Sequence, residues 1–298
     1  MKFSLPSVPP RESSKERRPR DDELDLFGVT HVGHTRPDNQ DHFLLCTVHP
    51  QVVLHGTSLP EPEALALRGE RLATIMLVAD GVGGTTAGST ASRLATEAVT
   101  GYVSSSLRSY HTAGSATEEE LTETLRAAAC VAHDAVRAEA MAMPGNGTMA
   151  TTLSLAVVIW PWLYVVQVGD SRCYLFRGGV LRQVTRDQTI AQELVDQGVL
   201  AADKAQSSPL SHVLSSAIGS ADARPEITRV DVRGTGTVIL VCTDGLTKHV
   251  ADKEIAQHLE RMRSSEEACQ ALLQLALDRG GTDNITLVVG QVLPRSGP

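Results

Sequence analysis

Residues 75–88, IMLVADGVGGTTAG, join an apolar run to one acid and a cluster of glycines. Five apolar residues lead directly into Asp80, and three of the next four residues are glycine. The apolar run predicts a buried strand, whereas an ordinary turn needs only one or two glycines. Because glycine lets other groups come close to the main chain, the cluster indicates that a ligand approaches the backbone beside Asp80.

The composition is that of a folded globular protein. The 298 residues are 42% hydrophobic and 21% charged, and this length suits one large domain or two small ones. A formal net charge of -8 argues against nucleic acid as a partner, because phosphate backbones select basic surfaces. No apolar run approaches the roughly 18 residues of a membrane helix, so we expect no membrane partner.

The ends of the chain are expected to lie outside one central domain. Residues 1–25 are rich in proline, serine and charge and lack the apolar core of a signal peptide, so we predict a flexible leader. Residues 26–294 form the predicted domain, with a partly ordered connection at 49–70, and residues 295–298 form a tail. Scattered cysteines without metal-type spacing indicate a reducing cytoplasm; they are Cys46, Cys130, Cys173, Cys242 and Cys269.

Strand-like and helix-like segments are interleaved along this domain. Strands are predicted at residues 41–48, 71–80, 150–160, 163–170, 172–184, 237–245 and 284–293. Helices are predicted at residues 89–107, 117–143, 245–260 and 264–281, two of them with capping boxes, Thr117 with Glu120 and Ser264 with Glu267. Neighbouring strands are separated by short breaks, which favours antiparallel pairing over a regular alternation of strand and helix.

Asp80 is one of four aspartates at the ends of predicted strands. Asp170 and Asp244 also follow apolar runs, and Asp283 precedes one. Asp-Gly after a strand ordinarily forms a hairpin turn, but Asp80 and Asp244 lead into predicted helices. Carboxylates gathered in one region need compensating positive charge, and ligation by oxygen alone selects Mg²⁺ or Mn²⁺.

A further candidate site lies at residues 31–45, HVGHTRPDNQDHFLL. Arg36 offers a planar fork that suits phosphate oxygens, and Asp41 would extend the metal site. Taken alone, the stretch is also compatible with an exposed arginine beside a turn.

Six motifs in this order, RPDNQD, ADGVGG, MATTL, VGDSR, CTDGL and DNIT, resemble the signatures of the metal-dependent, type 2C serine/threonine protein phosphatases in their bacterial form. They extend from about Gly28 to about Leu293. The resemblance implies an α+β fold, a four-layer αββα sandwich of two mainly antiparallel sheets flanked by helices. It also implies two Mn²⁺ or Mg²⁺ ions, with a third possible, at one end of the sandwich.

The resemblance implies a role for each matched residue. Asp80 bridges both ions, and Gly81 binds one of them through its carbonyl. Asp244 and Asp283 bind the other ion, and Asp170 belongs to the weaker third site. The remaining matches are Asp41 and Gln40, which reach the ions largely through water, Asn284, which supports the ligands, and Arg36, which holds the substrate phosphate.

Two positions depart from the family pattern. Val82 stands where some relatives have the histidine that protonates the leaving group, which leaves the general acid unassigned, with His34 as a weak candidate. Ala150 replaces a common glycine, and we interpret that position as packing. Residues 185–219 match a mobile flap beside the active site.

The activity implied is hydrolysis of phosphoserine and phosphothreonine on proteins by a water activated at the two-metal centre. Expected partners are phosphorylated proteins, such as serine/threonine kinases or their substrates, in the cytoplasm. The alternative is a catalytically silent, phosphatase-like module that binds metal and regulates. Two other classes of protein fit the sequence poorly. Phosphotransferases that attack with aspartate need an Asp-x-Asp arrangement, whereas Asp80 is followed by Gly-Val-Gly. A dinucleotide-binding site needs a third glycine that GVGGTT lacks.

Overall fold

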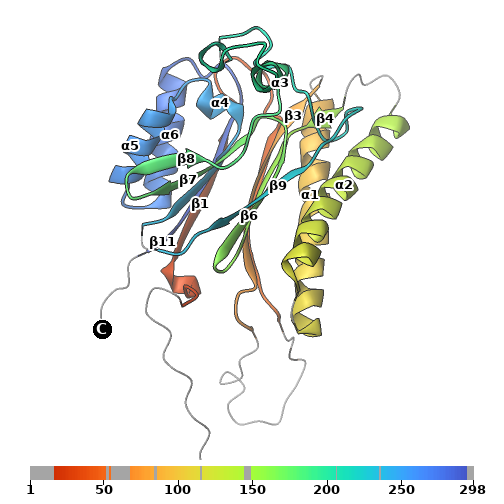
Figure 1. Cartoon of the computed structure of the whole chain (residues 1–298), viewed down its shortest axis with the longest axis vertical. Coiled ribbons are helices and arrows are strands. Elements are labelled where there is room, and N and C mark those ends of the chain that lie inside the picture. The colour runs from red at the N-terminus through yellow and green to blue at the C-terminus, as the bar shows by residue number, and fades with distance from the viewer. Residues whose placement is uncertain are drawn as a thin grey trace, which may run out of the picture.

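Two antiparallel sheets pack face to face between two layers of helices (Figure 1). The computed structural model describes residues 17–51, 54, 68–83, 86–114, 116–143, 149–205, 207–234 and 236–293. The first sheet has the strand order β1 (Leu24–His31), β11 (Ile285–Val292), β10 (Val238–Cys242), β7 (Arg172–Arg177) and β8 (Val180–Gln183). The second has the order β2 (Asp41–Val48), β3 (Ala73–Val82), β5 (Leu153–Ile159), β6 (Trp162–Val168) and β9 (Glu226–Asp231), and the short β4 (Ala150–Thr151) pairs with the end of β3. The predicted αββα architecture is confirmed.

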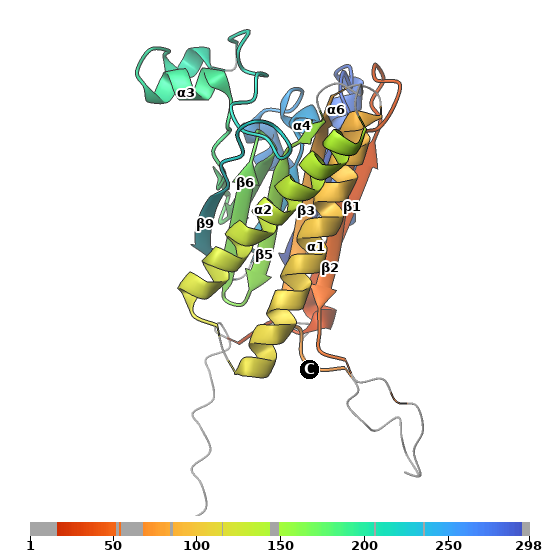
Figure 2. The same cartoon turned by 90° about the vertical axis from the view of Figure 1, so that its right-hand side faces the viewer.

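The helices cover the two outer faces. The second sheet is covered by α1 (Ala87–Ala113) and α2 (Glu118–Ala142), and the first by α4 (Asp244–Thr247), α5 (Asp252–Arg261) and α6 (Ser265–Asp278). Figure 2 shows α3 (Ile190–Asp196) standing off the end of the sandwich, in the segment between β8 and β9. In the described part of the chain, no helix combines the length and the apolar character that crossing a membrane requires.

The alternation of side chains along β3 places Asp80. Ile75 and Leu77 pack against α1 and α2, whereas Met76 and Val78 pack between the two sheets. Since successive side chains of a strand point to opposite faces, Asp80 continues the Met76–Val78 row. The acid therefore lies at the end of the layer between the sheets.

Several boundaries differ from the predictions. Strand β1 begins inside the predicted leader, and residues 17–23 also contact the domain, because the Arg71 guanidinium donates to Asp21 and to the Pro19 carbonyl at 2.6 and 2.7 Å. Residues 1–16, most of 49–70 and the predicted tail lie outside the described residues. The helix predicted at 245–260 is divided into α4 and α5.

The capping box predicted at the start of α2 is confirmed, whereas the one predicted at the start of α6 is only half formed. Thr117 and Glu120 make the reciprocal capping box at the start of α2. At α6 the Ser264 hydroxyl accepts from the Glu267 amide, but the Glu267 carboxylate accepts from the amide of Arg263 rather than that of Ser264.

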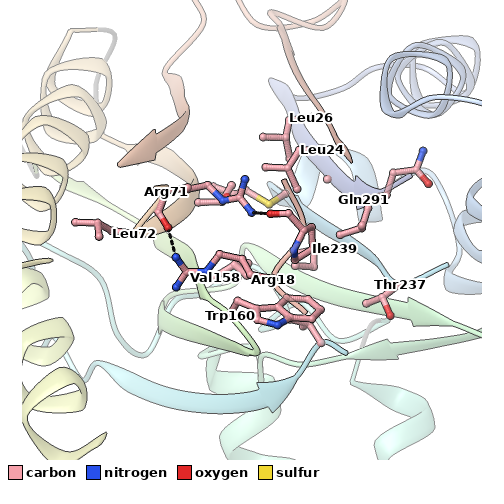
Figure 3. A pocket seen from close by; sticks show the side chains of 16 residues that line it. Arg18, Leu24, Leu26, Arg71, Leu72, Val158, Trp160, Thr237, Ile239 and Gln291 are labelled. Carbon is pink, nitrogen blue, oxygen red and sulfur yellow. Dashed lines mark hydrogen bonds between the residues drawn. The ribbon is translucent and has the colours of Figure 1, made fainter. Parts of the chain in front are cut away.

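An apolar pocket lies between the sheets at the end away from Asp80 (Figure 3). Its walls include Leu24, Leu26 and Ile239, and Arg18 donates to the Arg71 carbonyl beside it at 2.6 Å. The residues that line this pocket include no aspartate or glutamate. The acidic residues singled out by the sequence therefore belong to the opposite end of the sandwich.

Candidate metal centre

Asp41 and Asp80 lie directly opposite each other on β2 and β3. Opposite residues of an antiparallel pair share a face, so both carboxylates point between the sheets. Asp41 Oδ2 accepts hydrogen bonds from the Thr243 and Thr286 hydroxyls of the other sheet at 2.9 and 2.6 Å, but its Oδ1 has no partner. Burial raises the pKa of Asp41 to about 7, and burial together with the Asp41 charge raises the pKa of Asp80 well above its usual range.

Asp244 and Asp283 come from the first sheet, where the end of β10 lies beside the start of β11. The Lys248 ammonium lies 2.6 Å from Asp244 Oδ2 and 2.7 Å from Asp283 Oδ2. Arg36 Nε lies 2.8 Å from Asp283 Oδ1. Burial would raise the pKa of Asp283, but hydrogen bonds from Arg36 and Lys248 outweigh it, and the pKa is lowered.

Asp170 follows β6 in the turn that leads to β7, and its side chain is buried. Burial, followed by the charges of Asp244 and Asp187, raises the pKa of Asp170 well above its usual range, and the nearby Lys248 charge opposes the rise. The charges of neighbouring aspartates from both sheets thus make Asp41, Asp80 and Asp170 harder to ionise.

Two threonines hold the backbone of Asp80. The Asp80 amide donates to Thr152 Oγ1 at 2.9 Å, and the Asp80 carbonyl accepts from the Thr152 amide and the Thr151 hydroxyl at 2.9 and 2.8 Å. No role for these threonines of MATTL was predicted from the sequence. Thr243 and Thr286 were missed in the same way, although all four lie within the quoted motifs, beside or near the aspartates.

Gly81 is required by its main-chain neighbours. A Cβ atom at Gly81 would lie 2.3 Å from the carbonyl oxygen of Gly88 and 2.8 Å from that of Gln40. The sequence suggested that this glycine admits a ligand, whereas the group that approaches it here is the start of α1. The glycine thereby lets helix, strand and the Gln40 loop meet beside Asp80.

Gly245, next to Asp244, is more tightly enclosed, since a Cβ atom there would lie 1.9 Å from the Asn284 carbonyl oxygen. We expect Gly245→Ala to lower the free energy of unfolding by about 3 kcal/mol, because the clashing atoms are backbone and cannot rotate away. Urea denaturation measures the change. Gly101→Ala is the matched control, because its added methyl meets open space on α1 and should stabilise the helix by about 0.5–1 kcal/mol. A Gly245→Ala protein as stable as the wild type would contradict the packing described.

Asn284 positions the loop that carries Arg36. Its amide donates to the carbonyls of Val32 and Asp38 at 2.9 and 3.0 Å, and its Oδ1 accepts from the Gln40 amide at 2.9 Å. Three bonds from one side chain thus fix the Arg36 loop against the start of β11.

One cleft brings the predicted residues together. Eight of the nine line it, namely Arg36, Gln40, Asp80, Gly81, Asp170, Asp244, Asp283 and Asn284, while Asp41 is buried. Residues 212–217 and 220–222 line the same cleft, so part of the predicted flap lies beside the carboxylates. Val82 also lines it and is 39% exposed, whereas His34 is not among the described residues lining this cleft.

The donor set fits a hard divalent cation. Asp41 Oδ1 and Asp244 Oδ1 are buried without a hydrogen-bond partner, and buried polar atoms are rarely left so. Across the ranges described, no three His, Cys, Asp or Glu side chains are arranged so as to hold a metal ion together. Lys248 contacts oxygens of Asp244 and Asp283, and Arg36 contacts oxygens of Asp283. Carboxylate oxygens with uncompensated negative charge are the donors that Mg²⁺ and Mn²⁺ prefer.

Comparison with known proteins identifies the family. The model of the family described as protein phosphatase 2C matches residues 59–278. The chain is 34% identical over 221 residues to the serine/threonine protein phosphatase PstP of Mycobacterium tuberculosis, covering 74% of this chain and 41% of PstP. It is 32% identical over 216 residues to the serine/threonine phosphatase stp of Listeria monocytogenes, covering 72% of this chain and 83% of that protein. The chain belongs to the protein phosphatase 2C family.

Solved structures agree with this assignment. The crystal structure of the M. tuberculosis phosphatase PstP/Ppp has a TM-score of 0.72 at 28% identity and covers 91% of this chain and 99% of that one. The catalytic domain of PstP in complex with two manganese ions has a TM-score of 0.69 at 27% identity, with coverage of 91% and 99%. Since the first of the relatives by sequence is matched over 41% of its length, the match concerns this domain and not the whole of that protein.

Proposed function

We propose that the chain hydrolyses phosphoserine and phosphothreonine on proteins with the help of two divalent cations, Mn²⁺ or Mg²⁺. The observation that carries the proposal is the convergence of aspartates from both sheets on one cleft, with buried carboxylate oxygens that lack partners. Family membership and the manganese bound by the PstP catalytic domain support it. Asp80 would contact both ions, because it lies opposite Asp41 and lines the same cleft as the aspartates of the other sheet.

Aspartates from both sheets and one backbone carbonyl would bind the metal ions. Asp41, Asp244 and Asp283 would hold the ions with Asp80, and the Gly81 carbonyl would complete one ligand set. Two divalent ions supply the acidity that ionises a water near neutral pH and the charge that neutralises phosphoryl oxygens.

Arg36 would hold the substrate phosphate. Its side chain is 55% exposed in the cleft, and its planar fork suits phosphoryl oxygens. Val82 lines the cleft and carries no ionisable group, and we propose that the leaving oxygen takes its proton from solvent.

The setting of the reaction is also a proposal. We infer that the substrates are phosphorylated kinases or their targets, and that the chain acts in signalling in the cytoplasm. All five cysteines are free thiols, which fits a reducing compartment. The residues at 212–217 that line the cleft beside the aspartates are proposed to influence substrate choice.

The direct test is phosphate release from a phosphothreonine peptide. The purified chain should release phosphate with Mn²⁺, stop when a chelator is added, and recover when Mn²⁺ is restored. If no release occurs with several phosphopeptides and metals while Mn²⁺ still binds, the chain is the silent metal-binding module instead.

A further inference from the structure

Lys248 is a partly buried ammonium among the proposed metal ligands. Of the lysines in the described ranges, Lys204 and Lys253 are exposed, whereas the Lys248 side chain is 24% exposed. Its Nζ lies 2.6 and 2.7 Å from oxygens of Asp244 and Asp283. The ammonium therefore forms ion pairs with both carboxylates in the metal-free cleft.

The position of Lys248 follows from the local fold. It is the C-cap residue of α4, four residues after Asp244, so its side chain reaches back over that carboxylate. The start of β11 lies beside the end of β10 and brings Asp283 to the other side of the ammonium. One cation thus bridges two carboxylates that lie 39 residues apart in sequence.

The same oxygens are needed for two purposes. Asp244 Oδ2 and Asp283 Oδ2 contact the ammonium, Arg36 Nη2 donates to Asp283 Oδ2 at 2.9 Å, and Asp244 Oδ1 has no partner. A divalent ion that binds Asp244 Oδ2 or Asp283 Oδ2 would displace the ammonium. The free energy of breaking those ion pairs is subtracted from the free energy of binding the ion.

We infer that Lys248 is a built-in counter-ion that competes with a divalent cation for Asp244 and Asp283 and so weakens binding of that cation. This inference rests on the metal centre of the proposed function. It makes Lys248 a residue that stabilises the metal-free protein and sets how much free metal the chain needs. Once displaced, the flexible side chain can turn into the cleft that it lines.

A nearby ion pair shows the difference between this arrangement and a purely structural one. Arg172 and Asp187 are also partly buried and pair at 2.6 Å, but Asp187 lies outside the set of aspartates predicted to bind metal. Arg172 also donates to the Tyr174 hydroxyl. Lys248, in contrast, has as its ion-pair partners the two carboxylates that the metal would require.

The test compares the full-length chain with Lys248→Met in two measurements. Calorimetric titration of chelator-stripped protein with Mn²⁺ gives the affinity, and thermal melting in chelator gives the stability of the metal-free state. We expect Lys248→Met to bind one ion about tenfold more tightly, equivalent to about 1.4 kcal/mol, and to melt at a lower temperature in chelator. A general loss of structure would lower both the Mn²⁺ affinity and the melting temperature. Tighter Mn²⁺ binding together with a lower melting temperature in chelator therefore identifies competition.

Two variants serve as controls. Lys253→Met removes the same charge from an exposed position on α5 and should change neither measurement. Lys248→Arg keeps the charge and should keep an Mn²⁺ affinity close to that of the wild type. If Lys248→Met does not fold in chelator, its affinity is measured from the Mn²⁺-loaded protein by competition with a fluorescent chelator.

The outcomes separate this inference from the proposed function. Suppose that the wild type binds Mn²⁺ and releases phosphate, but Lys248→Met binds Mn²⁺ no more tightly. The role of Lys248 is then overturned, and the proposed function stands. A wild type that binds no Mn²⁺ overturns both.

Discussion

Asp80→Asn should lower phosphate release at saturating Mn²⁺ by about 10³-fold and raise the melting temperature of the protein in chelator. A loss of about 4 kcal/mol in stabilisation of the transition state corresponds to that factor. The pKa of Asp80 is raised by burial first and then by the charges of Asp41, Asp244, Asp170 and Asp283, so ionising this carboxylate is costly in the metal-free protein. The asparagine side chain is uncharged. It therefore removes a negative charge that would bind the metal and that destabilises the metal-free protein.

The fold around Asp80 should survive the substitution. The bonds to Thr151 and Thr152 use the Asp80 backbone and are kept in the variant. Asp222→Asn is the control, because it removes an exposed carboxylate from the flap side of the same cleft and should leave activity nearly unchanged. Wild-type turnover in Asp80→Asn, or a lower melting temperature in chelator, would contradict this account.

Arg36→Ala should lower kcat/KM for a phosphothreonine peptide by about 10²-fold, the scale on which removing a preorganised donor slows a reaction. The guanidinium is exposed in the cleft, and its contacts with Asp283, at 2.8 and 2.9 Å, hold it beside the metal ligands. A phosphoryl group in the cleft would lose a charged, bidentate partner. Steady-state kinetics on the peptide measures the loss.

The variant Arg36→Lys separates the effect of the positive charge from that of the planar guanidinium geometry. It keeps the positive charge but not the planar fork, so its kcat/KM should fall between those of the wild type and Arg36→Ala. Mn²⁺ binding should persist in both variants, because Arg36 is a cation beside the metal ligands. An Arg36→Ala enzyme with unaltered kcat/KM would remove Arg36 from the role of phosphate ligand.

Most of the fold could be predicted because apolar runs and turn residues are local signals. Strand β2 occurs at the predicted residues, and the glycine cluster does separate β3 from α1. Strands β1 and β9 were missed. Residues 24–25 fell inside a segment whose polar composition indicated a leader, and β9, with the sequence EITRVD, contains only two apolar residues.

The site was less predictable where it depends on contacts between distant segments. Sequence indicated that Asp80, Asp244 and Asp283 belong together, and the structure places them around one cleft; their roles as metal ligands stay a prediction. Lys248 was missed, because a lysine four residues after an aspartate looks like an ordinary pair on a helix surface. Its contact with Asp283 arises only when β10 and β11 pair.

The most direct measurement is anomalous diffraction from crystals of the chain soaked in Mn²⁺. We predict two manganese peaks between the sheets, with Asp80 touching both and with Asp244 and Asp283 on one of them. Crystals that take up Mn²⁺ elsewhere, or that show this cleft without manganese at saturating concentration, would contradict it.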